Sequence, residues 1–243
     1  MSSLTQCVSI LETLKLQGIA KTVTQEDVPK DMSHMAFLQH LLDREVEYRT
    51  ERRLRRNLTG AHFPVEKHIA DFEAQRVSGI THTEITNLAE CTWIDKKQNL
   101  LLFGPPGIGK THLAIALGLE AVQRGYKVCF ERITNLIKLL KTMDIQRSST
   151  FRINRIMKSD VLIIDEIGYT PIDRKEANLF FMLVSELYER TSIIITSNKG
   201  FDSWAEMLGD EVMTTALLDR LLHHANIYSL DGVSYRISKK KES

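Results

Sequence analysis

The chain has 243 residues with 32 lysines and arginines against 31 acidic residues, so its net charge gives no evidence for a nucleic-acid partner and any basic surface must be local. Its three cysteines include no Cys-x-x-Cys pair, which argues against zinc or dithiol chemistry and favours the reducing cytoplasm. No basic leader precedes an apolar segment, and the longest apolar runs are far too short to cross a bilayer, so we expect a cytoplasmic protein without a membrane partner.

The first part of the chain, up to about residue 98, is predicted to be helical. Ser3 and Gln6 form a capping-box pattern ahead of an apolar stripe, and Gly18 supplies a stop for this first helix. Ser33 can cap a longer second helix, which we expect to run into a series of arginines and to end before the Thr59-Gly60 pair.

The second predicted helix carries a stripe of arginines. Its members fall at i, i+3, i+4 and i+7 and therefore share one helix face: Arg49, Arg52, Arg53 and Arg56. Like charges along one face destabilise a helix unless an anion compensates them, and a phosphate backbone would do so. Acidic residues in the preceding turns, Asp43, Glu45 and Glu47, fit an ordinary salt-bridged surface helix equally well. The residues alone leave both interpretations open.

The chain changes character at Asn99. A capping box at Thr81 and Glu84 predicts one more short helix, which ends near Trp93. Short apolar runs then alternate with helix-length stretches, and the runs cover residues 100–103, 127–130, 161–164 and 193–196. Such runs are typical of buried parallel strands, so we predict an α/β core.

The first predicted strand leads directly into a glycine-rich loop. The residues Gly104, Pro105, Pro106, Gly107, Ile108, Gly109, Lys110 and Thr111 match G-x-x-x-x-G-K-[ST] and open a helix. Glycines let the backbone N–H groups point inward at the positive end of this helix, where phosphates bind. Lys110 then reaches the β and γ phosphates, the Thr111 hydroxyl binds Mg²⁺, and His112 completes the predicted nucleotide site. The alternative is a turn that merely connects strand and helix, but strand, loop and helix all meet the requirements of an ATP-binding loop.

The third predicted strand ends in two adjacent acids, Asp165 and Glu166. Ligands of open α/β sheets bind at the carboxyl ends of the strands, where both acids fall. Successive side chains diverge at a strand end, so Asp165 can face Mg²⁺ while Glu166 activates the attacking water. Acids also end strands for purely structural reasons, but their position downstream of the phosphate-binding loop favours hydrolysis.

These motifs and three further stretches resemble a known family. The stretches cover residues 99–114, 160–166, 196–204, 216–224 and 232–237. Together they are similar to the AAA+ initiator and loader group, and within it to the IstB-like transposition helper ATPases, with DnaC-type helicase loaders as near relatives. The resemblance implies an α/β AAA+ P-loop core whose parallel sheet is flanked by helices, plus a small N-terminal helical domain.

The resemblance also implies roles for three polar residues. Asn198 matches the sensor that helps orient the water, although an Asn-Lys-Gly turn would explain it too. Arg220 matches the arginine finger that a neighbouring subunit inserts at the γ-phosphate, with a surface ion pair to Asp219 as the alternative. Arg236 matches the second sensor arginine of helicase loaders, although the sequence leaves no room for a full helical lid.

Two other groups of residues have a less defined role. A second basic set lies where initiator-type AAA+ proteins carry an extra helix that faces DNA, and it consists of Lys141, Arg147, Arg152, Arg155 and Lys158. His223 and His224 are adjacent on a predicted helix, so they do not share a face and form a poor metal pair.

The resemblance implies three regions: a helical region for DNA or a partner at 1–72, a linker and pre-core helix at 73–98, and an ATPase core at 99–243. It also implies a Mg²⁺-dependent ATPase that forms a homo-oligomer on double-stranded DNA, with ATP sites between subunits, and recruits and stimulates a transposase. The runner-up is a helicase loader that resembles DnaC. A small-molecule kinase is disfavoured by the acid pair Asp165 and Glu166, and a module that only holds ATP is disfavoured by Glu166.

Overall fold

The computed structural model describes residues 3–25, 32–168 and 172–235, which form two compact units. The first unit comprises residues 1–56 and the second residues 57–243. Within the described residues, unit 1 contains α1 (Ser3–Thr13), α2 (Gln17–Gln25) and most of α3 (His34–Ala61). The Ser33 hydroxyl accepts a hydrogen bond from the Ala36 N–H at 3.2 Å, so the predicted cap of the second long helix is confirmed.

The prediction that Gly18 stops the first helix is wrong. Helix α1 already ends at Thr13, and Gly18 lies inside the first turn of α2. A Cβ atom on Gly18 would lie 2.8 Å from the Cα of Glu45 and 2.8 Å from the Cβ of Tyr48. Glycine is therefore needed here because it lets α2 approach the backbone of α3 closely.

The start of α2 is held by a carboxylate from α3. The buried Glu45 carboxylate accepts hydrogen bonds from the N–H groups of Gly18 at 2.6 Å and Ile19 at 3.1 Å, and from Arg49 Nε at 2.6 Å. Burial alone would raise the pKa of Glu45, but the bonds from Arg49, Ile19 and Gly18 outweigh it and lower the pKa. Glu45 thus satisfies N–H groups that the first turn of a helix leaves without partners.

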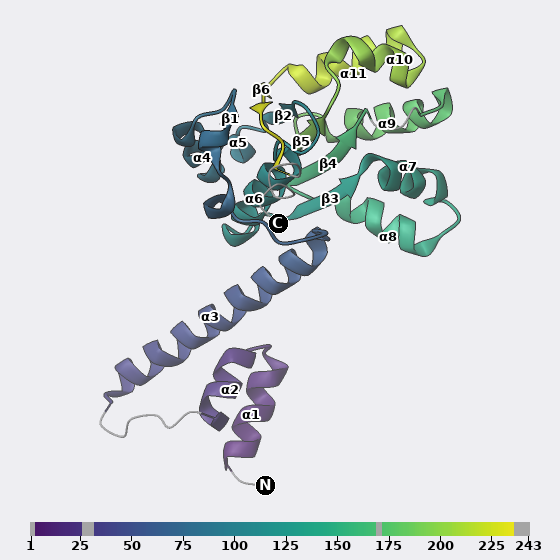
Figure 1. Cartoon of the computed structure of the whole chain (residues 1–243). Coiled ribbons are helices and arrows are strands. Elements are labelled where there is room, and N and C mark those ends of the chain that lie inside the picture. Colours follow the sequence, from purple (N-terminus) through teal and green to yellow (C-terminus); the bar gives the residue numbers. More distant parts are fainter. Residues whose placement is uncertain (1–2, 26–31, 169–171, 236–243) are drawn as a thin grey trace, which may run out of the picture. The chain divides into compact units, whose positions relative to one another are not determined.

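Unit 2 is built on a five-stranded parallel sheet of order β3-β4-β5-β2-β6 (Figure 1). The strands are β2 (Asn99–Phe103), β3 (Val128–Arg132), β4 (Val161–Ile167), β5 (Ser192–Ser197) and β6 (Ala225–Ser229). The four strands expected from apolar runs are confirmed. Strand β6 was not predicted, because its mixed sequence Ala-Asn-Ile-Tyr-Ser suits the edge of the sheet, where it pairs with β2. A separate short antiparallel pair joins β1 (Val77–Ser78) to β7 (Asp231–Gly232).

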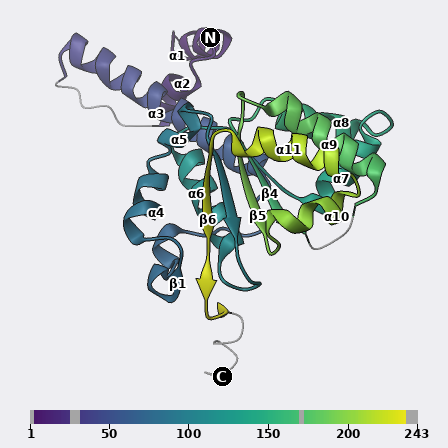
Figure 2. The same cartoon turned by 90° about the horizontal axis from the view of Figure 1, so that it is seen from above.

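Helices cover both faces of the sheet (Figure 2). One face packs on α4 (His82–Ala89), α5 (Thr92–Asp95), α6 (Lys110–Gln123) and the end of α3. The other packs on α7 (Ile133–Thr142), α8 (Arg147–Ile156), α9 (Arg174–Leu187), α10 (Trp204–Leu208) and α11 (Glu211–Leu222). Short 3₁₀ turns lie at Ile69–Asp71, Ala74–Arg76 and Phe201–Ser203. Along β2, Leu100 and Leu102 face the first core while Leu101 and Phe103 face the second, so the predicted α/β fold is confirmed.

The predicted helix before the core is divided in two. Thr81 and Glu84 form the expected capping box of α4, but this helix ends at Ala89. Trp93 lies in the separate α5, where its indole N–H donates to the Leu88 carbonyl at 2.9 Å and its ring is buried. The break lies at Cys91, whose backbone adopts a left-handed conformation with φ 61°. Burial raises the pKa of the Cys91 thiol to about 11, so this thiol is not a reactive nucleophile.

One member of the second basic set is a core residue. Arg152 is buried and forms an ion pair with Glu131, with 2.5 Å between Nε and Oε1. Its other nitrogens donate to the carbonyls of Gly60 at 2.8 Å and Ala61 at 3.3 Å, while Arg155 also donates to Gly60 at 2.9 Å. Arg152 therefore cannot face DNA as expected, because it caps the carbonyl groups at the end of α3.

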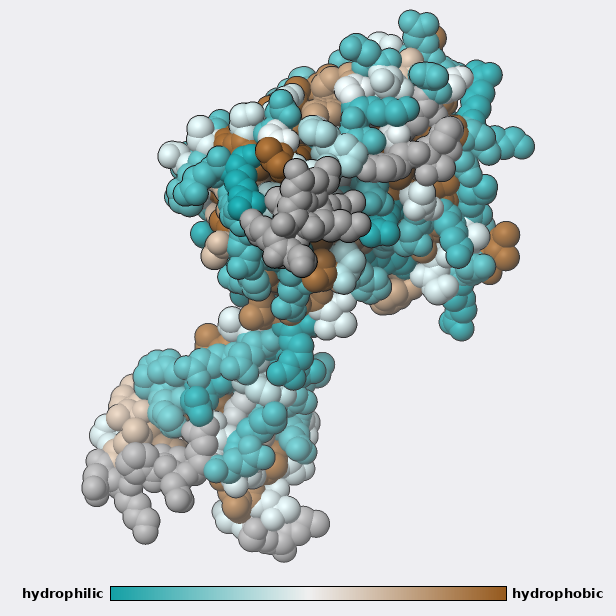
Figure 3. All heavy atoms as spheres, viewed as in Figure 1, coloured by the Kyte–Doolittle hydropathy of each residue, from teal (hydrophilic) through white to brown (hydrophobic). Residues whose placement is uncertain are grey.

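No described helix is both long enough and apolar enough to cross a bilayer. In the space-filling view, hydrophilic residues cover most of the visible surface and hydrophobic residues form small separate groups (Figure 3).

We predict that Arg152→Ala lowers the free energy of unfolding by about 3–5 kcal/mol, because it leaves the Glu131 carboxylate buried without its charge partner. The measurement is chemical denaturation followed by circular dichroism. Arg147→Ala is the matched control, since Arg147 is exposed on the same helix α8. A loss as small as that of Arg147→Ala would contradict a buried ion pair.

Candidate active site

The glycine-rich loop lies between β2 and α6 at the carboxyl end of the sheet. Gly104, Gly107 and Gly109 have φ values of +146°, +83° and +107°, which side chains with a Cβ atom rarely adopt. A Cβ atom on Gly104 would also lie 2.1 Å from the Leu230 carbonyl oxygen. The loop is held at its start by the Gly104 N–H, which donates to Ser197 at the end of β5 at 3.2 Å. These contacts fix the curled conformation that a phosphate-binding loop needs.

Lys110 opens helix α6, and its ammonium group lies within the curl of the loop. Its Nζ donates to the carbonyls of Gly104 at 2.6 Å and Pro105 at 2.9 Å. Helix α6 begins here, so the N–H groups of its first turn have no helical acceptor and add positive potential beside the ammonium group. The chemistry of this donor set fits the phosphates of a nucleotide.

Asp165 is the buried centre of the site. Its Oδ1 accepts hydrogen bonds from the hydroxyls of Thr111 at 2.7 Å and Thr196 at 2.6 Å. The Thr196 hydroxyl in turn accepts from the Glu166 N–H at 3.0 Å. The set joins α6, β4 and β5. Thr111 and Asp165, the two metal-binding residues predicted from the sequence, therefore lie in direct contact. Thr196 was not predicted as a site residue, although it lies at the end of a strand in one of the stretches that carry the family resemblance.

Glu166 points away from this set. It lies at an irregularity of β4 between Ile164 and Ile167, and its φ of 65° is unfavourable for a residue with a Cβ atom. Its carboxylate pairs with Arg132 at the end of β3, with 3.5 Å between Arg132 Nε and Glu166 Oε2. The carboxylates of Glu166 and Asp165 thus have different partners. Arg132 could not be predicted as a neighbour of Glu166, because only strand pairing brings it beside β4.

Asn198 follows β5 and lies beside the turn after β4. A Cβ atom on Gly168 would be 3.1 Å from its Oδ1, so the amide faces this turn. Among the described residues, Asn198 Oδ1 is one of three buried side-chain atoms without a hydrogen-bond partner. An unpaired buried acceptor costs about 1–3 kcal/mol, so this oxygen can gain from a donor such as an ordered water.

His112 faces the other side of α6. Its Nε2 lies 2.9 Å from the His68 carbonyl oxygen, and its ring contacts Phe72. The side chain is therefore occupied by structural contacts, and His112 can serve a nucleotide through its backbone N–H in the first turn of α6.

Arg220 lies at the opposite end of the sheet from the loop. Its guanidinium stacks over Phe181 at 4.8 Å and donates to the Ala216 carbonyl at 2.8 Å. It lines a hollow together with Asn99 and Thr191, which lie at the amino ends of β2 and β5. A five-residue strand such as β2 spans roughly 16 Å at about 3.3 Å per residue, so Arg220 does not reach the loop of its own chain. Arg236 lies outside the described residues.

The arginine stripe is exposed on α3, and two of its members hold unit 1 together. Arg49 pairs with Glu45, as described above, and Arg52 donates to Gln17 Oε1 at 2.7 Å. Arg53 and Arg56 are exposed further along the helix. The structure therefore gives Arg49 and Arg52 a packing role and leaves their contact with DNA a prediction.

The fold of the core is similar to that of two solved proteins. The crystal structure of the DnaC helicase loader superposes with a TM-score of 0.52 at 22% sequence identity, covering 61% of this chain and 87% of that chain. The crystal structure of DnaI superposes with a TM-score of 0.57 at 20% identity, covering 68% of this chain and 91% of that chain. At these identities the likeness shows the fold, which is that of the AAA+ loaders.

Sequence relatives extend over almost the whole chain. An insertion sequence IS21 putative ATP-binding protein of Pseudomonas aeruginosa is 38% identical over 237 residues, which cover 96% of this chain and 89% of the relative. An insertion sequence IS5376 putative ATP-binding protein of Geobacillus stearothermophilus is 39% identical over 211 residues, or 87% and 84% of the two chains. Residues 9–243 match the model of the IstB-like ATP binding protein family. With the curled loop around Lys110 and the acid pair at the end of β4, these matches show that the chain belongs to the IstB-like ATP-binding family.

Proposed function

We propose that this protein hydrolyses ATP with Mg²⁺ and serves as the ATPase helper of an insertion sequence. It assembles as a homo-oligomer on double-stranded DNA and recruits and stimulates a transposase, and hydrolysis resets the complex. Family membership and the names of its relatives support the setting. The observation that carries the chemistry is the buried set in which Asp165 holds the Thr111 hydroxyl next to the phosphate-binding loop.

In the proposed mechanism, the loop and the two acids have separate roles. Lys110 and the first-turn N–H groups of α6 neutralise the phosphates, while the oxygens of Thr111 and Asp165 would hold Mg²⁺. The bound ion supplies further positive charge for the phosphate oxygens. Glu166 accepts a proton from the attacking water, and Asn198 helps to orient that water.

We predict that Lys110→Ala abolishes ATP binding, whereas Glu166→Gln leaves binding intact and blocks turnover. Phosphate charge is neutralised in the ground state, while the water is activated only on the way to the transition state. Calorimetry measures binding, and phosphate release measures turnover. Glu186→Gln is the matched control, an exposed acid on α9. Hydrolysis by Glu166→Gln at the wild-type rate would overturn its assignment.

The place of Arg220 supports a site shared between subunits. It lies at the amino ends of the strands, whereas the loop lies at the carboxyl end of β2, so a second copy has to bring the two together. We propose that Arg220 of one subunit contacts the γ-phosphate held by Lys110 of the next.

The three cysteines are unpaired, which fits the proposed cytoplasmic location.

We predict that mixing Arg220→Ala with Lys110→Ala restores part of the ATPase activity that each variant lacks. Some interfaces in the mixture combine an intact loop with an intact arginine. Loss of an arginine finger slows hydrolysis by about 10³–10⁵, so recovery is readily measured by phosphate release. Arg190→Ala, which removes an exposed arginine, is the control. Mixtures as inactive as both parents would contradict action between subunits.

We propose that the stripe Arg49, Arg52, Arg53 and Arg56 contacts duplex phosphates without reading bases. The proposed functional regions are 1–72 for DNA and partners, 73–98 as linker, and 99–243 as ATPase core. Phosphate contacts position a protein on DNA, while base contacts specify the site. Arg53 is the best probe, because Arg49 and Arg52 also hold α2.

We predict that Arg53→Ala weakens duplex binding and flattens the log-log salt dependence by up to about one unit, because one counterion-releasing contact is lost. Affinity is measured across a salt series with ATP present. Arg44→Ala is the matched control, since Arg44 lies nine residues earlier on α3 and hence on about the opposite face. An unchanged slope would make this surface a docking site for a protein, and would favour a helicase loader over the transposition helper.

A further inference from the structure

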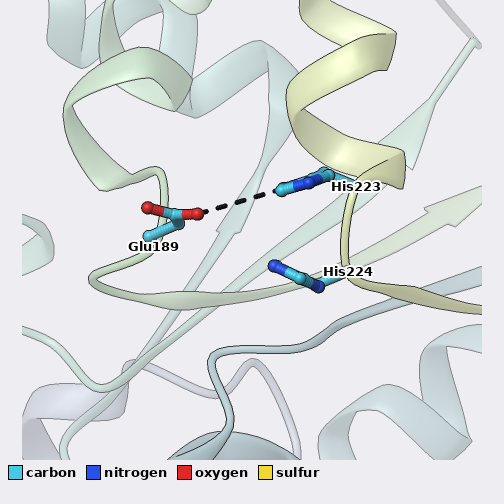
Figure 4. A group of neighbouring side chains, drawn as sticks. All are labelled: Glu189, His223 and His224. Carbon is cyan, nitrogen blue, oxygen red and sulfur yellow. Dashed lines mark ion pairs between the residues drawn. The ribbon is translucent and has the colours of Figure 1, made fainter.

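Three side chains with metal-binding chemistry converge far from the candidate active site. Glu189 comes from the turn between α9 and β5, and His223 and His224 come from the turn between α11 and β6 (Figure 4). One ligand atom from each residue lies within 4.8 Å of the others. In the part of the chain that the structure describes, this is the sole group of three such side chains with that spacing.

The expectation that the two histidines form a poor metal pair assumed that both lie within a helix. Helix α11 ends at Leu222; His223 caps it with helical backbone angles, and His224 lies beyond the helix, so helical spacing does not fix how the two side chains lie. Figure 4 shows both imidazole rings directed toward Glu189. The ring centroids of His223 and His224 are 4.1 Å apart.

We propose that Glu189, His223 and His224 bind a divalent transition metal ion, with Zn²⁺ as the preferred ion. Two imidazoles and one carboxylate are ligands that Zn²⁺ takes at about 2.0–2.2 Å, with a fourth position left for water. The hard ions Mg²⁺ and Ca²⁺ prefer oxygen ligands and are disfavoured by the two nitrogens. The site is distinct from the oxygens of Thr111 and Asp165, and this proposal does not depend on ATP hydrolysis.

The backbone on both sides of the cluster is already fixed. The His224 carbonyl accepts a hydrogen bond from the Asn99 N–H at 2.7 Å, and the N–H groups of Arg190 and Thr191 both donate to the Leu187 carbonyl at 3.0 Å. The three side chains themselves are exposed, so they can close from their present spacing to the roughly 3.4 Å between ligand atoms of a tetrahedral zinc site. The proposed closing is by rotation of these side chains.

Neighbouring groups suit a positive ion. The Glu189 carboxylate lies 3.9 Å from His223 Nδ1 and supplies negative charge. The Tyr188 hydroxyl lies 2.6 Å from the same nitrogen. In the proposed site this hydroxyl either stays beside the metal ion or is replaced by it at that nitrogen. Two cations, Lys97 and Arg220, line the same hollow as Glu189 and His224, and the Arg220 guanidinium is directed over Phe181. The cluster thus adjoins the residue that we assign to the subunit interface.

The test is calorimetric titration of the full chain with Zn²⁺, without nucleotide or affinity tag. A Cys7→Ser background removes an exposed thiol that could bind zinc by itself. We expect one Zn²⁺ per chain, and an affinity at least about tenfold lower in His224→Ala, since the loss of even an outer partner of a metal ligand costs 10–100-fold. His82→Ala, which removes an exposed histidine on α4, should bind zinc as the parent does.

Glu189→Gly separates loss of a ligand from loss of folding. Glu189 has a φ of 57°, which glycine adopts readily, so this variant should melt no lower than the parent yet bind zinc at least about tenfold more weakly. X-ray absorption at the zinc edge should show two imidazole ligands in the parent. The proposal is overturned if no saturable binding of one zinc occurs, or if such binding is unchanged in both His224→Ala and Glu189→Gly.

Discussion

A carboxylate that is removed from water must find hydrogen-bond donors, and Asp165 meets this requirement in a way that organises the whole site. It is 1% exposed, and its donors come from the first turn of α6 and from the end of β5. The phosphate-binding loop precedes one donor, and Asn198 follows the other. The Thr196 hydroxyl that donates to Asp165 also accepts the Glu166 N–H, while the partly exposed Glu166 carboxylate pairs with Arg132. The start of α6 after the loop, the end of β5 and the Glu166 backbone are therefore linked through one buried charge.

Features encoded over a few neighbouring residues were predicted well from the sequence. The phosphate-binding loop, the four buried strands, the Ser33 cap and the Thr81–Glu84 capping box all depend on local spacing, and the structure has each of them. The place of Asp165 beside Thr111 follows from a simple rule, since carboxyl ends of parallel strands meet at one edge of the sheet.

Features that depend on contacts between distant segments could not be predicted in this way. Arg152 looked like a surface cation because sequence spacing gives no sign that Glu131 and the end of α3 enclose it. Gly18 looked like a helix stop because its close contact with Glu45 arises only when α2 packs on α3. Strand β6 has no apolar run, and its residues are only partly buried at the edge beside β2. The roles of Asn198, Arg220 and the arginine stripe stay predictions, since they concern ligands and partners.

The separation of Arg220 from the loop of its own chain has a consequence for how hydrolysis would respond to crowding. A site completed by a second copy obeys mass action, so the rate per chain would rise with local protein concentration instead of staying constant. Free chains at low concentration would bind nucleotide and hydrolyse little of it. A surface that gathers many copies would raise turnover without any signal other than proximity. The rate of ATP hydrolysis per chain would then depend on how densely the protein is packed.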